Sequence, residues 1–213
     1  MKITKFGHCC LVIEERGLTI LTDPGAYSTA QNQAKGVDIV LITHEHADHL
    51  HVGSLKEVLA NNPAAEVLTN KGVGQILDKE GIRYTLVGHG QTVERKGVRI
   101  EGFGMDHWPM YQGLKVVENT AYFIGDRLFY PGDSFADPQK PIDILALPVA
   151  GPWATLSECV DYAKKMKPKF AFPVHEGMLM PDKLGPVHRV PESVLVPLGI
   201  QFVVIKEGES REF

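Results

Sequence analysis

The segment Thr43–Leu50 holds three histidines and one aspartate within six residues, directly after an apolar run. In extended backbone, the side chains of His44 and His46 project to the same side. We expect Asp48 and His49 to begin the next helix and to turn toward an adjacent point. Imidazole and carboxylate groups are ligands for zinc, iron or manganese. A solvated, histidine-rich turn is the alternative, but the close spacing favours one wall of a site for two neighbouring metal ions.

Four side chains cannot enclose two metal ions, so the hypothesis requires further ligands later in the chain. His107, Asp133 and His175 each follow an apolar run, at a point where a strand is expected to open into a loop. Asp126 competes with Asp133, because both follow a glycine. A Gly-Asp pair between two apolar runs is typical of a tight hairpin turn, and we assign Asp126 to such a turn. The predicted metal ligands are therefore His44, His46, Asp48, His49, His107, Asp133 and His175.

Three further residues are candidates for supporting roles. His8 ends the first expected strand, where it either lines the site or serves as a hydrogen-bonded structural histidine. Asp23 closes another strand, where it either accepts a proton from the second ring nitrogen of a ligand histidine or forms a turn with Pro24. His188 lies in a proline-rich C-terminal stretch that we expect to be a loop, and it either lines a substrate pocket or has no binding role.

The other histidines and the cysteines carry weaker signals. We expect His51 to be solvated at the start of a helix and His89 to lie in a turn. Cys9, Cys10 and Cys159 are odd in number and include an adjacent pair, so a disulfide framework is not expected. We expect all three to be small buried hydrophobic residues.

Apolar runs bounded by Gly, Pro and Asp predict strands, and apolar residues at helical spacing predict helices. The first strands follow one another through tight turns, as in an antiparallel sheet, and the middle of the chain alternates strand and helix, as in a layered α/β protein. The predicted strands cover residues 2–6, 9–13, 18–22, 37–43, 66–70, 83–87, 98–103, 120–124, 127–131, 143–149, 169–174 and 200–206, and the predicted helices cover 52–62, 72–81 and 155–167.

A similar order of elements returns after about residue 104. We therefore expect one domain over residues 1–213, built of two similar halves, about 1–103 and 104–213. Each half would form a sheet with helices on one face, and the halves would pack sheet to sheet.

Length and charge narrow the class of protein. A chain of 213 residues can bury a core of its own. Its net charge of −4 at pH 7 comes without a Lys/Arg cluster, which argues against long nucleic acid as a ligand and favours a small-molecule substrate. No apolar run approaches a membrane span, and the N-terminal one is too short for a signal peptide. We expect a cytoplasmic protein without membrane contacts, and a homo-oligomer stays open.

The order His44-x-His46-x-Asp48-His49, followed by His107, Asp133 and His175, resembles the metallo-β-lactamase superfamily over essentially the whole chain. Segments 1–25 and 146–178 are similar to small metal-dependent hydrolases related to ascorbate-6-phosphate lactonases. The resemblance implies a four-layer αβ/βα sandwich with the metals at one edge, between the two sheets. It also implies a first metal held by His44, His46 and His107, a second held by Asp48, His49 and His175, and Asp133 bridging the two.

The same resemblance implies a function. It points to a dinuclear metal-dependent hydrolase in which a metal-bridging hydroxide attacks a small ester, lactone or phosphoester, with Asp48 and Asp133 as catalytic residues. Zinc is the first choice for the two divalent metal ions, and manganese and iron stay open. A mononuclear-iron redox enzyme of the sulfur dioxygenase type on the same fold is the alternative. A non-catalytic relative that keeps the fold as a binding module is a third hypothesis.

Overall fold

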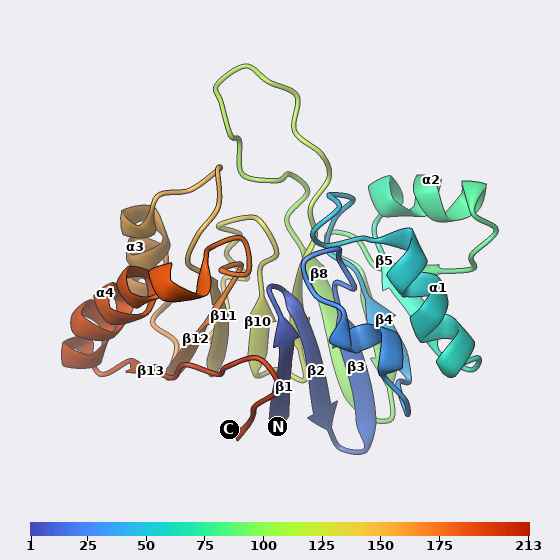
Figure 1. The fold of residues 1–213 in the computed structure, drawn as a ribbon, viewed down its shortest axis with the longest axis horizontal. Helices are drawn as coiled ribbons and strands as arrows, with labels where there is room; N and C mark the ends of the chain where they lie inside the picture. The colour runs from blue at the N-terminus through green and yellow to red at the C-terminus, as the bar shows by residue number, and fades with distance from the viewer.

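Two seven-stranded β-sheets face each other in the computed structural model, which describes residues 1–213 (Figure 1). The first sheet has the order β14-β1-β2-β3-β4-β5-β6 and the second has the order β13-β12-β11-β10-β9-β8-β7. The first sheet consists of β1 (Lys2–Gly7), β2 (Cys10–Glu15), β3 (Leu18–Thr22), β4 (Ile39–Leu41), β5 (Glu66–Thr69), β6 (Thr85–Leu86) and β14 (Ser210–Glu212). The second consists of β7 (Thr92–Arg95), β8 (Val98–Phe103), β9 (Ala121–Ile124), β10 (Leu128–Tyr130), β11 (Ile144–Pro148), β12 (Phe170–Val174) and β13 (Gln201–Phe202).

Both sheets are mixed. In the first, β1, β2 and β3 pair antiparallel, and β3 to β6 pair parallel. In the second, β7 to β10 pair antiparallel, and β10 to β13 pair parallel. Parallel neighbours need a crossover, which helices can supply on the outer faces. The helices are α1 (Val52–Asn61), α2 (Lys71–Lys79), α3 (Leu156–Met166) and α4 (Gly185–Leu195), with short 3₁₀ turns η1 (Ala30–Gln33), η2 (Pro181–Lys183) and η3 (Val196–Leu198).

Three buried clusters define four layers. Side chains such as Ile13, Leu41 and Phe172 fill the space between the sheets. A second cluster packs α3 and α4 onto the outer face of the second sheet, and a third packs α1 and α2 onto the outer face of the first. The predicted αβ/βα sandwich is therefore confirmed. None of the helices combines the length and apolar composition that crossing a membrane would require.

The boundary between the halves differs from the sequence expectation. The chain changes sheets between β6 and β7, so β7 and β8 belong to the second sheet, although residues up to 103 were expected in the first half. β7 was missed because its sequence, TVER, is short and only Val93 in it is apolar. The C-terminal strand β14, also missed, returns to the first sheet, where Arg211 lies opposite Ile3 of β1.

The proline-rich stretch that holds His188 is helical, so its prediction as a loop is wrong. Pro186 lies in the first turn of α4, where a backbone N–H would have no partner within the helix. Pro191 lies inside the helix, and its ring is buried together with Val187 and Leu195. Packing onto the second sheet therefore outweighs the local cost of the internal proline.

Candidate metal centre

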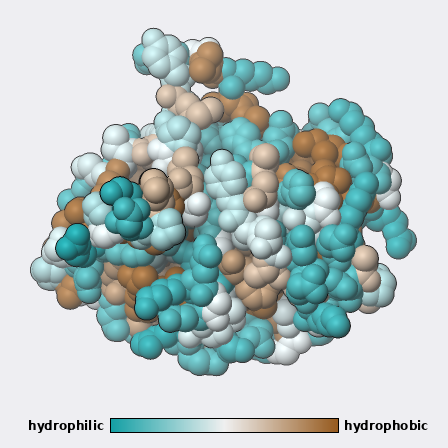
Figure 2. Space-filling view, in the orientation of Figure 1, coloured by the Kyte–Doolittle hydropathy of each residue, from teal (hydrophilic) through white to brown (hydrophobic).

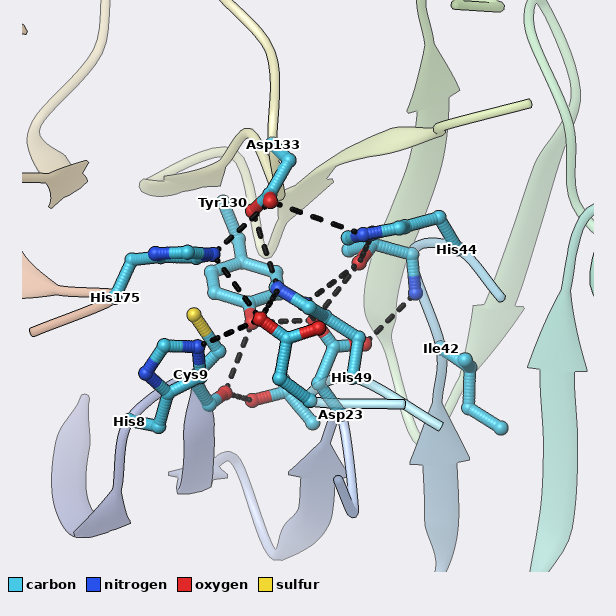
Figure 3. A network of polar contacts seen from close by, with 12 residues as sticks. His8, Cys9, Asp23, Ile42, His44, His49, Tyr130, Asp133 and His175 are labelled. Atoms are coloured by element: carbon cyan, nitrogen blue, oxygen red, sulfur yellow. Dashed lines mark hydrogen bonds and ion pairs between the residues drawn. The ribbon is translucent and has the colours of Figure 1, made fainter. Parts of the chain in front are cut away.

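All seven predicted ligands lie in loops that follow the carboxyl ends of strands at one edge of the sandwich. The Thr43–Leu50 segment follows β4, His107 follows β8, Asp133 follows β10 and His175 follows β12. β4 ends at Leu41, two residues earlier than predicted, and the chain leaves the sheet there. Figure 3 shows side chains from both halves of the chain converging on one point.

Asp48 and His49 lie in a turn and not in the helix that was expected to begin with them. The backbone N–H of His49 donates to the carbonyl of His46 at 2.9 Å, which closes the turn. Helix α1 begins only at Val52, where the ring of His51 accepts a hydrogen bond from Ser54 N. The turn lets Asp48 and His49 face the same region as His44 and His46.

One group of ligand atoms comes from His44, His46, His107 and Asp133, which lie within 4.8 Å of one another. Oδ2 of Asp133 lies 3.3 Å from Nε2 of His107 and 3.8 Å from Nε2 of His44. All of these side chains are buried except His46, which is partly exposed. This is the set that the resemblance assigned to the first metal, together with the proposed bridging carboxylate.

A second group surrounds Asp48. Its Oδ2 atom lies 3.5 Å from Nε2 of His175, 3.8 Å from Nε2 of His49 and 3.2 Å from Nε2 of His8. The ligand atoms of His8, Cys9, His49 and His175 also lie within 4.8 Å of one another. His8 therefore stands beside the second group, with its ring centroid 4.2 Å from that of His175.

Asp133 connects the two groups. Its Oδ1 lies 3.1 Å from Nε2 of His49, and its Oδ2 lies 3.0 Å from Nε2 of His175. The carboxylate thus faces histidines of the second group as well as His44 and His107 of the first. A side chain in this place can contribute an oxygen to each of two cations.

The unpartnered atoms of the cluster fit metal ions. Nε2 of His44, His49, His107 and His175 and Oδ1 of Asp133 are buried and make no hydrogen bond. Buried polar atoms without protein partners are costly, and a group of them with converging lone pairs is the arrangement that a cation needs. Imidazole nitrogen and carboxylate oxygen suit zinc, manganese or iron. The residues present therefore fit the cations that the sequence predicts.

Hydrogen bonds on the far sides of the rings orient these nitrogens. Nδ1 of His49 lies 2.8 Å from Oδ2 of Asp23, and Nδ1 of His107 lies 2.5 Å from the carbonyl oxygen of Trp108. An acceptor at Nδ1 holds the ring proton there, so Nε2 keeps its lone pair for a cation. Nδ1 of His44 contacts the Thr43 hydroxyl at 3.1 Å.

Asp23 is the centre of a buried network. Its carboxylate accepts hydrogen bonds from Thr43 N at 2.8 Å, from Thr43 Oγ1 at 2.8 Å and from Tyr130 Oη at 2.6 Å, besides the contact with His49 (Figure 3). Tyr130 was not identified from the sequence, because a phenol within an apolar run looks like an ordinary core residue. Only its hydroxyl group takes part in the polar network.

A match to a protein family covers residues 2–175 of the chain, and the family is described as a β-lactamase superfamily domain. The chain belongs to this superfamily. The Mycobacterium tuberculosis protein Rv0786c is 35% identical to this chain. The match covers 87% of this chain and 88% of Rv0786c. A UPF0173 metal-dependent hydrolase of Thermoplasma acidophilum is 27% identical over 82% of this chain and 83% of its own.

Among solved structures, Igni18, a metallo hydrolase from Ignicoccus hospitalis, is similar to this chain. Its TM-score is 0.77, with 21% identity, and the match covers 100% of this chain and 98% of the other. At this identity the likeness concerns the fold alone. It agrees with the sandwich described above.

The histidines and carboxylates of the two ligand groups strongly influence one another's pKa values. Burial, and then the neighbouring His49, hold the pKa of His44 well below its ordinary value. Burial alone would lower the pKa of His175, but Asp133 and Asp48 outweigh burial and raise it to about 9. Burial would raise the pKa of Asp133, but His49, His175 and His44 hold it well below its ordinary value. The carboxylate is therefore ionised at neutral pH, as a metal ligand must be.

The remaining sequence expectations have mixed outcomes. Asp126 lies in the β9–β10 turn with a φ of 56°, which confirms its assignment to the hairpin. The three cysteines are free and buried, as expected. His188, in α4, lies 3.6 Å from Oε1 of Glu176 and lines a cavity of about 470 Å³ that also includes Lys5. Glu176, which directly follows His175, also lines this cavity.

Aromatic residues line the side of the cluster formed by the second half. The ring centroid of Trp153 lies 5.7 Å from those of His107 and His175, and Phe135 packs against Trp153 at 5.6 Å. Beyond His107, the chain forms a long loop that projects from the sandwich (Figure 1) and carries exposed side chains such as Tyr111. In Figure 2 this loop stands clear of the surface and carries both hydrophobic and hydrophilic residues.

Proposed function

We propose that this chain is a dinuclear metal-dependent hydrolase that acts on a small ester, lactone or phosphoester. Membership of the β-lactamase superfamily and relatives named as metal-dependent hydrolases support hydrolysis. The observation that carries the dinuclear part is the place of Asp133, whose two oxygens face His49, His175, His107 and His44 at 3.0 to 3.8 Å.

In this proposal the first cation would be held by His44, His46 and His107, and the second by Asp48, His49 and His175. Asp133 contributes to both. When bound, the cations would supply a nucleophilic water at neutral pH and would stabilise the charge that develops on the attacked group. No serine or cysteine nucleophile is needed. Zinc is the first choice for both positions, with manganese and iron as alternatives.

The protein's own residues then set the geometry. Asp133 fixes the spacing between the two ligand groups, and Asp23 fixes the ring of His49. Burial would raise the pKa of Asp48, but the nearby imidazoles of His175, His8 and His49 hold it far below its ordinary value. Asp48 therefore stays ionised, and we assign it to holding the second cation and orienting the attacking water. It is 19% exposed, so a substrate can approach from its side.

The test combines metal analysis with a substrate panel. We expect up to two metal ions per chain and turnover of one class among lactones, phosphodiesters, phosphomonoesters and thioesters. Asp133→Asn should lose one or both ions and nearly all turnover while it stays folded. Asp126→Asn is the matched control, because Asp126 also follows a glycine but is 62% exposed in a hairpin turn. Full activity of Asp133→Asn on every accepted substrate would refute the bridging role.

The same experiment separates the redox alternative. A mononuclear-iron enzyme would bind iron tightly at one position, consume oxygen with a persulfide substrate and hydrolyse nothing in the panel. One tightly bound iron with oxygen uptake would therefore replace the hydrolase proposal. A protein that binds no metal in metal-supplemented medium would instead support the non-catalytic binding module.

A further inference from the structure

Lys5 is a buried cation that reaches from one sheet to the other. It belongs to β1 in the first sheet and is only 2% exposed. Its Nζ donates a hydrogen bond to the carbonyl oxygen of Pro173 at 2.8 Å and forms an ion pair with the carboxylate of Glu176. Pro173 lies in β12 of the second sheet, and Glu176 lies in the loop after it. The two partners of Lys5 therefore flank the proposed ligand His175.

The position of Lys5 within its strand is unusual. Residues of β1 alternate between partly exposed and buried, and Lys5 takes a buried position between Ile3 and Gly7. Such a position normally holds an apolar side chain, because burying an ammonium group is costly unless it is paired. Glu176 is also buried, at 6% exposed. Replacing buried ion pairs by apolar residues often leaves stability unchanged, so stability alone does not account for this pair.

The loop that these contacts hold is strained. His175 has a φ of 69°, a left-handed conformation that residues other than glycine rarely adopt. Such conformations persist where the surroundings fix them. The backbone N–H of His175 donates to His8 O at a long 3.4 Å. Shorter contacts lie on either side: Lys5 bonds to Pro173 O and Glu176, and Leu179 N donates to Glu176 O at 2.9 Å.

Gly177, two residues after His175, packs against the first sheet as well. A Cβ atom there would lie 2.9 Å from Cβ of His8. The loop from His175 to Gly177 thus packs against the residue that follows β1. Lys5, on the same strand, binds the backbone before this loop and the side chain of Glu176 within it. Because β1 and β12 belong to different sheets, no ladder of backbone hydrogen bonds joins them, and Lys5 adds a polar link to the apolar packing between the sheets.

We propose that Lys5 and Glu176 form a positioning pair that fixes the His175 loop against the first sheet and thereby sets the affinity of the second metal position. This inference rests on the proposed function for its metal part. Neither residue touches the reacting atoms in this view. Lys5 acts through the backbone of Pro173 and the side chain of Glu176, so that Nε2 of His175 faces Asp48 and Asp133.

The variants are chosen to keep the fold. Lys5→Met alone leaves Glu176 buried without its cation, so the double variant Lys5→Met/Glu176→Gln removes both charges and keeps both side-chain volumes. Lys2→Met is the matched control, because Lys2 belongs to the same strand but is 41% exposed and pairs with Glu14 on the surface. Circular dichroism would verify that each variant is folded.

Two measurements then test the pair. The first is hydrogen exchange of the metal-free protein, read for the peptide that covers residues 171–180. We expect exchange in this peptide to be at least tenfold faster in the double variant than in the parent and unchanged in Lys2→Met. The second is metal retention against a graded chelator. We expect one of two ions to be lost at a chelator concentration at least tenfold lower, with the other ion unaffected.

The outcomes are distinct. Unchanged exchange in a folded double variant would overturn the positioning role. Faster exchange with unaltered retention of both ions would overturn its link to the metal. If the parent protein binds no metal, the proposed function fails, but the exchange measurement still decides whether Lys5 and Glu176 hold the loop. Equal loss of both ions would also count against the proposal, because it predicts a selective effect on the position held by His175.

Discussion

Oδ2 of Asp23 lies 2.8 Å from Nδ1 of His49, and both side chains are fully buried. The contact fixes which nitrogen of His49 faces the cluster. Asp23→Asn keeps the size of the side chain but removes the charge that favours the Nδ1 proton. We expect metal affinity at the second position to fall by about 10- to 100-fold, as for other partners of ligand histidines. Competition with a chromophoric chelator would measure this loss.

Asp38→Asn is a suitable control for Asp23→Asn. Asp38 is partly exposed and pairs with Lys96 on the surface, at 2.8 Å. Its replacement should leave the metal affinity at the parent value. Equal affinities for the parent and Asp23→Asn would mean that Asp23 serves only the network with Thr43 and Tyr130.

The absence of a side chain at Gly25 leaves space for the turn that contains Asp48. A Cβ atom on Gly25 would lie 1.8 Å from the carbonyl oxygen of Asp48 and 2.7 Å from N of His49. Gly25→Ala must therefore displace that turn, and overpacking of this kind costs about 2 kcal/mol of stability. We expect weaker binding of the second metal and a large loss of turnover, measured on the same samples.

Gly36→Ala provides the comparison for Gly25→Ala. Gly36 has a φ of 74° and no atom within 4 Å of the Cβ site. Its replacement should cost about 1 kcal/mol through backbone strain, with metal content unchanged. If Gly25→Ala lost no more metal than Gly36→Ala, the close approach of Gly25 to the backbone of Asp48 would not be needed for metal binding.

Much of the fold followed from local pattern. Strands such as β2 and β12 have continuous apolar runs bounded by turn residues, and the ligands occur where these runs end. The parts that were missed have weaker local signals. The helix α4 contains Pro186 and Pro191, and only its packing onto the second sheet shows that the prolines are tolerated. The edge strand β14 is exposed throughout, so its sequence has no apolar alternation.

The candidate site divides in the same way. The types and spacing of the ligands could be predicted because chemistry restricts a metal ligand to a few residue types. The supports could not be predicted as easily. Tyr130 and Lys5 reach Asp23 and Glu176 over sequence separations of 107 and 171 residues. Their roles depend on tertiary contacts, and a lysine in a strand is ordinarily expected to face solvent.

Metal binding should stabilise the protein, because the unpartnered nitrogens of His44, His49 and His107 gain a ligand only in the folded state. A cation present at 100 times its dissociation constant adds about 2.7 kcal/mol of stability per site. We expect zinc to raise the melting temperature of the metal-free protein and Asp133→Asn to abolish most of this rise. A parallel series with manganese and iron would rank the three ions. An unchanged melting temperature with all three would contradict the metal assignment.

The acid side of the stability profile should depend on His8. Burial lowers its pKa to about 4 from 6.5, the nearby His175 and His49 add to the lowering, and the contact with Asp48 opposes it. Between these values the unfolded chain takes up a proton and the folded metal-free protein does not. The contribution of His8 is therefore fully present above pH 6.5 and is lost as the pH falls toward 4, at a cost of about 2 kcal/mol between pH 7 and pH 5. Urea unfolding of the metal-free protein at these two pH values, compared with His8→Asn, isolates this part from the other histidines. The variant should lose about 2 kcal/mol less than the parent, and equal losses would show that His8 is already protonated in the folded protein near neutral pH.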